Sequence, residues 1–321
     1  MWRRRLSAYS LAHNCLVPKN IYIYSPSGAV RDKAAFKRGV RRLQALGHNV
    51  EVDVNALRSV QRFAGTDEER VESIARAAAS GADVALISRG GYGLTRILGD
   101  IPYKAVARAI DKGTHFVGIS DFTAFQMALF AKTGAQTWAG PALCEGFGAA
   151  PIPDDIMEDC FADMLTGQGE GVGWRQSGKG VPADIQWSAR NATLWGGNLS
   201  ALVSLLGTPY FPQIKGGVLF LEDVAEAPYR VERMLTQLLH SGVLAQQKAV
   251  ALGQFTDYRL TPHDKGFNLQ AVVGWLRSQL KIPVLTNLPF GHVPTKVLLP
   301  FGAKVDGAVQ GRDVLLAWGH L

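Results

Sequence analysis

The sequence contains few cysteines and no long apolar run, and both absences narrow the class of protein. Its three cysteines, Cys15, Cys144 and Cys160, show neither a disulfide framework nor the spacing of a metal site. This usage is typical of a reducing compartment, so we expect a cytoplasmic protein without a bound metal. No segment approaches the length of a transmembrane helix, and we therefore expect no membrane partner.

A continuous basic track is also missing. The chain has 34 Lys and Arg against 27 Asp and Glu, which gives a formal net charge of +7. This excess is mild, and the basic residues are not interleaved with aromatic residues, so we expect no nucleic-acid partner. We expect the positive charge to keep the protein soluble and to attract acidic small molecules. With 47% hydrophobic residues in 321, the chain can bury a large core and form two domains.

The N-terminus lacks the cleavage site of a signal peptide. Arg3–Arg5 precede the stretch Leu6–Val17, but polar residues interrupt that stretch and no small-residue site follows it. We therefore interpret residues 1–19 as an extended or disordered leader.

Apolar strands and amphipathic helices alternate through the first half of the chain. The expected strands are 20–24, 49–54, 84–88 and 114–119, and the expected helices begin near 32, 66, 103 and 121. This alternation predicts an α/β fold with a parallel sheet covered by helices on both faces. Ligands bind at the carboxyl ends of such strands, where three glycine- or serine-rich turns should meet. These turns are 25–28, 89–93 and 118–121.

The pattern loosens between the two halves, where prolines, one amphipathic helix and many glycines crowd together. We place a linker at 151–182, between an N-terminal domain at 20–150 and a C-terminal domain at 183–321. The second half carries strands and helices of its own. Among them we expect a helix opening at 195, a buried strand at 217–221 and strand-like segments at 296–300 and 314–318.

Ser120 stands at the expected corner between a strand and a helix. A serine at such a corner points off the end of the sheet, beside the first N–H groups of the helix, and those donors can hold an oxyanion. Serine hydrolases place their nucleophile in this way, although Gly-Ile-Ser-Asp departs from the usual Gly-x-Ser-x-Gly. On these residues alone, an N-cap serine is the simpler interpretation.

A serine nucleophile requires a base and an acid that orients it. Of the seven histidines, His292 stands out because it ends the constrained loop Asn-Leu-Pro-Phe-Gly-His. A surface histidine explains it equally well. Glu222 follows a buried strand and is a candidate for the orienting acid, with Asp223 as a competitor and an acidic helix start as the structural alternative.

Six motifs, taken in chain order, resemble those of the LD-carboxypeptidases, the muramoyltetrapeptide carboxypeptidase family. They are Ser-Pro-Ser-Gly (25–28), Ser-Arg-Gly-Gly-Tyr-Gly (88–93), Gly-Ile-Ser-Asp-Phe-Thr-Ala (118–124), Gly-Gly-Asn-Leu-Ser (196–200), Phe-Leu-Glu-Asp (220–223) and Pro-Phe-Gly-His (289–292). The resemblance extends from about residue 20 to near the C-terminus.

The resemblance implies a serine peptidase that removes the terminal D-alanine from murein tetrapeptides, by cutting an L,D-type bond in cytoplasmic peptidoglycan recycling. The matching positions imply a triad of Ser120 as nucleophile, His292 as base and Glu222 as its orienting acid. The resemblance also implies a flavodoxin-like N-terminal domain, a smaller β-rich α/β C-terminal domain and a homodimer, with no metal or organic cofactor.

Four further residues are candidates for binding the substrate. The oxyanion would be held by the N–H of Asp121 and by one N–H of the Gly90–Gly91 turn. Arg89 offers bidentate donors for the free α-carboxylate that a carboxypeptidase must recognise. A structural salt bridge explains Arg89 nearly as well.

Two other functions fit the same motifs. One is an amidase similar to the microcin-immunity proteins, which cleave peptidyl or aminoacyl nucleotide conjugates. The other is a non-catalytic protein that binds muropeptides on a hydrolase-like fold. Turnover of the two substrate classes and labelling by a serine-directed phosphonate distinguish these possibilities.

Overall fold

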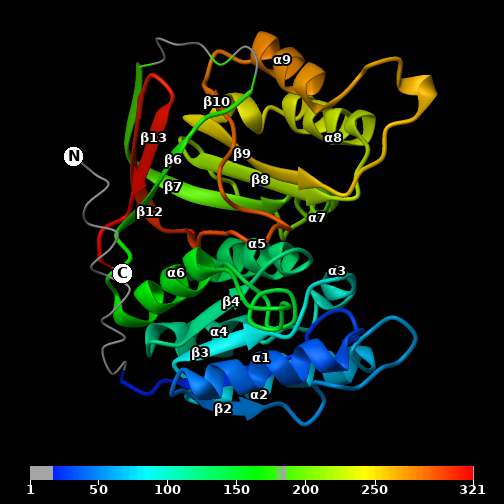
Figure 1. Cartoon of the computed structure of the whole chain (residues 1–321), viewed down its shortest axis with the longest axis vertical. Helices are drawn as coiled ribbons and strands as arrows, with labels where there is room; N and C mark the ends of the chain where they lie inside the picture. The colour runs from blue at the N-terminus through cyan, green and yellow to red at the C-terminus, as the bar shows by residue number, and fades with distance from the viewer. Residues whose placement is uncertain (1–16, 179–180, 182–185, 321) are drawn as a thin grey trace.

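The computed structural model describes residues 17–178, 181 and 186–320. Most of the predicted leader, residues 1–19, and Cys15 lie outside the described residues. The chain forms two β-sheets stacked along the long axis of the molecule, with helices between them and around them (Figure 1). No helix in the described part of the chain is both long and apolar enough to cross a bilayer.

The first sheet contains six strands. They are β1 (Asn20–Tyr24), β2 (Asn49–Val52), β3 (Val84–Ile87), β4 (His115–Gly118), β5 (Thr137–Ala139) and β11 (Leu299–Phe301). Their order is β11-β5-β4-β3-β1-β2, and only β11 pairs antiparallel with its neighbour. Without β11 the order 2-1-3-4-5 is that of a flavodoxin-like sheet, so the predicted fold class is confirmed for this half.

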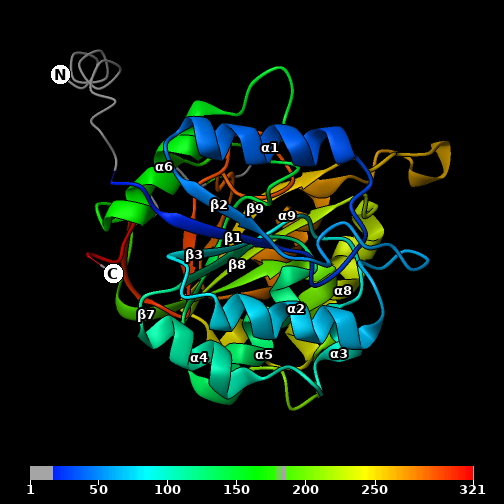
Figure 2. The same cartoon turned by 90° about the horizontal axis from the view of Figure 1, so that it is seen from below.

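Helices cover both faces of the first sheet, as Figure 2 shows. One face carries α1 (Lys33–Ala45) and α6 (Asp155–Thr166). The opposite face carries α2 (Asp67–Ala79), α3 (Leu94–Ile97), α4 (Tyr103–Asp111) and α5 (Phe122–Thr133). α2 begins at the predicted capping box, in which the side chains of Thr66 and Glu69 each accept the backbone N–H of the other residue.

The second sheet contains seven strands. They are β6 (Gly171–Arg175), β7 (Gln186–Asn198), β8 (Val218–Val224), β9 (Ala249–Thr256), β10 (Val284–Leu285), β12 (Lys304–Gln310) and β13 (Asp313–Ala317). The strands β7 to β10 run parallel, and β12, β13 and β6 extend the sheet antiparallel from β7. Its helices are α7 (Leu199–Ser204), α8 (Pro228–His240) and α9 (Leu269–Gln279), with 3₁₀ turns at Leu244–Gln246 and Pro262–Asp264. This mixed sheet agrees with the β-rich α/β class expected for the second half.

The structure differs from the expected elements along β7 and at three further strands. Residues 195–198 were expected to open a helix, but they pair with β8, and α7 begins only at Leu199. No strand was expected at β5, β6, β12 or the first part of β7, because very short, glycine-containing or alternating stretches give a weak strand signal. In β6 only Val172 and Trp174 are buried, while the neighbouring residues are exposed.

Helix α5 joins the two halves physically. Its residues 122–129 are all buried, because the helix contacts α3 and α4 on one side and α7 and β7 on the other. A helix that is apolar on every side needs such enclosure. The residues at its N-terminus are therefore held by both layers of the molecule.

Candidate active site

Ser120 lies where β4 turns into α5, and its backbone is in the left-handed region with a φ of 68°. For an L-residue other than glycine this conformation costs roughly 1–2 kcal/mol. The N-cap of α5 is Asp121, and in the described part of the chain the hydroxyl of Ser120 has no hydrogen-bond partner. The N-cap interpretation of Ser120 is therefore wrong, and the strained corner has the geometry of a nucleophile elbow.

The side chain of Asp121 ties together the three turns that were expected to meet at the carboxyl edge of the sheet. Its carboxylate accepts hydrogen bonds from the hydroxyl of Ser27 and from the N–H of Leu94, the latter at 2.9 Å. The N–H of Gly28 donates to the carbonyl of Gly90 at 3.2 Å, so the predicted meeting of the turns is confirmed. Burial raises the pKa of Asp121, although these hydrogen bonds oppose the shift. From the sequence, only the backbone N–H of Asp121 was expected to take part, and no local signal indicated this role of its side chain.

Gly90 packs directly against the candidate nucleophile. A Cβ atom added at Gly90 would lie 2.5 Å from Cβ of Ser120 and 2.8 Å from its Oγ. In the described residues, the N–H groups of Gly90, Gly91 and Asp121 donate no hydrogen bond. Unpaired N–H groups beside a serine hydroxyl are suited to receive the charge of an oxyanion.

We expect Gly90→Ala to lower kcat/KM by about 100-fold, because the methyl group must displace the Ser120 corner by a large fraction of an ångström. Overpacking should also lower the free energy of unfolding by about 1–3 kcal/mol. The matched control is Gly274→Ala in α9, where an added Cβ meets nothing within 4 Å. Kinetics and thermal unfolding of both variants check this, and equal activity of the two would contradict it.

Glu222 and His292 form a close pair on the second sheet. His292 Nδ1 lies 2.7 Å from Glu222 Oε2, and because a carboxylate only accepts, the imidazole donates from Nδ1. Nε2 then carries the lone pair, as a general base requires. Burial lowers the pKa of His292, but the hydrogen bond and charge of Glu222, together with Asp223 and Glu145, outweigh it and raise that pKa above its ordinary value.

Asp223, the competing acid, points elsewhere. Its carboxylate accepts the N–H of Ser200 at 2.9 Å and Nδ2 of Asn198 at 2.8 Å. Burial and the neighbouring charge of Glu222 raise the pKa of Asp223 to about 6. Of the two acids, the structure therefore places Glu222, and not Asp223, in hydrogen-bond contact with the imidazole.

A chain of hydrogen bonds links the helix behind Ser120 to this pair. Thr123 Oγ1 in α5 accepts the N–H of Asn198 at 2.9 Å, and Nδ2 of Asn198 donates to Glu222 Oε1 at 3.2 Å. Gly197 leaves no room for a Cβ atom against Thr123, so the two halves approach closely here. No hydrogen bond joins Ser120 to His292 in the described part of the chain. Asn198 was not predicted as a site residue. Its position directly after Gly196 and Gly197 was the sequence signal that could have indicated a close approach of the backbone there.

Arg89 lies on the turn that carries Gly90. Its Nε is 3.6 Å from Oε1 of Glu145, and its Nη1 donates to the carbonyl of Ala29 at 3.3 Å. The guanidinium therefore has a weak ion pair and one backbone bond, which leaves most of its five donors available. Both interpretations of Arg89, a salt bridge and a substrate contact, agree with this geometry.

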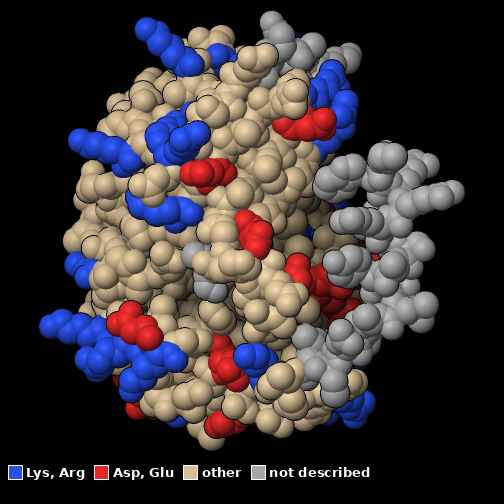
Figure 3. Space-filling view, turned by 90° about the vertical axis from the view of Figure 1, so that its left-hand side faces the viewer, with Lys and Arg blue, Asp and Glu red and all other residues tan. Residues whose placement is uncertain are grey.

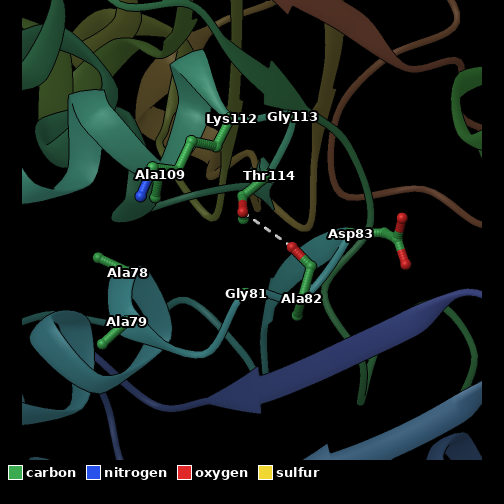
Figure 4. Close-up of a pocket in the computed structure, with 9 residues that line it drawn as sticks. All are labelled: Ala78, Ala79, Gly81, Ala82, Asp83, Ala109, Lys112, Gly113 and Thr114. Atoms are coloured by element: carbon green, nitrogen blue, oxygen red, sulfur yellow. Dashed lines mark hydrogen bonds between the residues drawn. The ribbon is translucent and has the colours of Figure 1, made fainter.

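A hollow of about 280 Å³ lies at the opposite edge of the first sheet (Figure 4). It is lined by small residues at the ends of α2 and α4, with Asp83 and Lys112 as its charged members. Thr114 donates its hydroxyl to the carbonyl of Ala82 there. Ligands of open α/β sheets bind at the other edge, so we assign this hollow no role in the chemistry.

Comparisons with known proteins identify the family. The model of the LD-carboxypeptidase N-terminal domain matches residues 21–140, and that of the C-terminal domain matches residues 191–306. A crystal structure of muramoyltetrapeptide carboxypeptidase from Oxalobacter formigenes superposes with a TM-score of 0.83 at 39% identity, covering 94% of this chain and 98% of the other.

Two curated relatives cover most of the chain. The murein tetrapeptide carboxypeptidase of Pseudomonas aeruginosa is 26% identical over 88% of this chain and 91% of its own. The microcin C7 self-immunity protein of Escherichia coli is 26% identical over 92% of both chains. Fold and comparisons together define a serine-type hydrolase. The chain belongs to the LD-carboxypeptidase family.

Proposed function

We propose that this enzyme releases the terminal D-alanine from murein tetrapeptides by hydrolysing an L,D-type bond. The observation that carries the proposal is the buried Glu222, whose carboxylate orients His292 at 2.7 Å. The strained corner at Ser120 supplies a hydroxyl on the other side of the same hydrogen-bonded chain. The names of the Oxalobacter and Pseudomonas relatives support the choice of substrate.

In the proposed mechanism, Nε2 of His292 takes the proton of Ser120, whose oxygen attacks the carbonyl before D-alanine. Glu222 stabilises the imidazolium that forms. The N–H groups of Asp121 and of Gly90 or Gly91 hold the oxyanion, and each such donor typically contributes roughly 2.7–4 kcal/mol to lowering the barrier. His292 then protonates the leaving amine, and water hydrolyses the acyl-enzyme through the same base. No step requires a metal or an organic cofactor.

The proposal also covers the setting of the enzyme. We place it in the cytoplasm, in peptidoglycan recycling, and as a homodimer, as the family resemblance implies. We further propose two domains, 20–150 and 183–321, joined by 151–182, with the site where they meet. The joining segment is more than a linker, because it supplies α6 to the first layer and β6 to the second sheet, and β11 returns from the second half to the first sheet. On the face that Figure 3 shows, basic and acidic side chains are interspersed.

A second candidate function is hydrolysis of an aminoacyl or peptidyl nucleotide conjugate. The observation behind it is the similarity to the microcin C7 self-immunity protein, which is as high as that to the Pseudomonas carboxypeptidase. The same catalytic residues would serve both reactions, so the difference lies in the leaving group.

A direct comparison of substrates tests the proposal. We expect mass spectrometry to detect D-alanine and a tripeptide from murein tetrapeptide, with a kcat/KM at least about 100-fold above that for an aminoacyl sulfamoyl adenosine, a 2.7 kcal/mol difference. The reverse preference would favour the second function. Absence of turnover on both substrates would contradict both.

A further inference from the structure

Lys296 is a buried cation with no partner in the described part of the chain. The residue is 4% exposed, yet its ammonium makes no hydrogen bond or ion pair there. Its Nζ is not among the fully enclosed polar atoms without a partner, so the nitrogen itself reaches a space open to solvent. A buried ammonium without a hydrogen-bonded or ion-paired partner is unfavourable, and such a group favours an anionic ligand.

Three carboxylates are close enough to interact electrostatically with Lys296, and each makes its direct contacts with other groups. They belong to Glu145, Asp154 and Glu222. Asp154 accepts the hydroxyl of Thr295 at 2.5 Å and caps α6. Glu222 accepts from His292 and Asn198. Glu145 pairs with Arg89 at the long distance of 3.6 Å.

Glu145 is the carboxylate that lies among the positively charged side chains of this region. Its carboxylate lies within the influence of the charges on Arg89, His292 and Lys296, and half of its side chain is exposed. Burial raises the pKa of Glu145, although the charges of Arg89, His292 and Lys296 oppose the shift. Arg89 and Lys296 carry two positive charges and Glu145 only one negative charge. The site therefore places two cationic side chains around one half-exposed carboxylate, and an incoming carboxylate can take the place of that one.

We propose that Lys296 and Arg89 together bind the C-terminal carboxylate of the substrate, and that Glu145 is the resident anion that this carboxylate displaces. The inference rests on the proposed function and extends it to a specificity residue outside the triad. A carboxylate held there would place the preceding peptide bond close to His292. The site would thus select a free C-terminus over an internal peptide bond.

The test uses Ser120→Ala protein, which binds without turnover, and two ligands that differ only at the C-terminus. One is murein tetrapeptide and the other is its C-terminal carboxamide. We expect Lys296→Met to weaken calorimetric binding of the free acid at least tenfold and that of the amide less than twofold. Lys296→Arg should restore most of the loss, and Glu145→Gln should tighten binding of the free acid.

Lys112→Met, at the far edge of the first sheet, is the matched control for loss of one positive charge. Replacing a buried ammonium by an apolar side chain should leave the protein at least as stable, which thermal unfolding checks. Equal losses for acid and amide, or no loss at all, would overturn the inference while the wild-type enzyme still releases D-alanine. If the wild type releases none, the proposed function itself fails.

Discussion

Ser120→Ala is expected to abolish release of D-alanine, with kcat falling by on the order of 10⁶-fold, the loss typical when a serine nucleophile is removed. The reason is local, because no other hydroxyl is placed at the strained corner between β4 and α5. Ser120 makes no side-chain hydrogen bond in the described residues, so its removal should leave the free energy of unfolding nearly unchanged. Single-turnover mass spectrometry and thermal unfolding measure the two quantities.

Ser120→Gly is the informative companion to this variant. Glycine adopts a φ of 68° without strain, so the glycine variant should be inactive and more stable than the wild type by roughly 1 kcal/mol. A gain in stability on loss of activity would show that the corner is strained for function. Substantial turnover by either variant would remove Ser120 from the role of nucleophile.

Glu222→Gln is expected to lower kcat by about 10⁴-fold, as in serine hydrolases whose orienting acid becomes an amide. The carboxamide can present its NH₂ group to Nδ1 of His292, which favours the wrong tautomer for a base on Nε2. Because the carboxylate is fully buried and also accepts from Asn198, the substitution keeps shape and packing. Pre-steady-state kinetics on the tetrapeptide measure the loss.

The pH profile gives this prediction a second, independent readout. His292 must be neutral to act as a base, and its pKa is raised, so the acid limb of kcat/KM in the wild type should lie above the ordinary pKa of histidine. In Glu222→Gln, burial prevails and the pKa of His292 falls, so the limb moves to lower pH. The pKa of Asp223, about 6 in the wild type, falls as well because it loses the repulsion from Glu222. Only His292 exchanges the proton in the reaction, so its pKa sets the limb, and a limb that moves upward would contradict the assignment.

A matched control separates orientation from charge. Asp223→Asn also removes one buried carboxylate beside Glu222, but Asp223 does not contact the imidazole. We expect it to lower kcat far less than Glu222→Gln does. Comparable losses in the two variants would mean that the network as a whole, and not the bond at 2.7 Å, determines the activity.

Much of this molecule follows from local signals in its sequence. Apolar β-branched runs and helix-spaced apolar residues determined the order of β1 to β4 and of their helices along the chain, because the periods of strands and helices depend only on neighbours along the chain. They did not predict that β5 and β11 complete this sheet. The same signals placed Ser120 at a corner and brought three turns to one edge. Short or glycine-rich strands such as β6 were not predicted, since their pairing partners lie far away in the sequence.

Only the tertiary structure decided which side chains meet. The contact of His292 with Glu222 spans 70 residues, and that of Thr123 with Asn198 spans 75. No period along the chain encodes such distances, so the sequence could not choose between Glu222 and Asp223. Nor could it show that Lys296 is buried without a partner near Glu145. The burial of a side chain and the choice of its hydrogen-bond partner depend on how the layers pack, so they are fixed only when both halves of the molecule pack against α5.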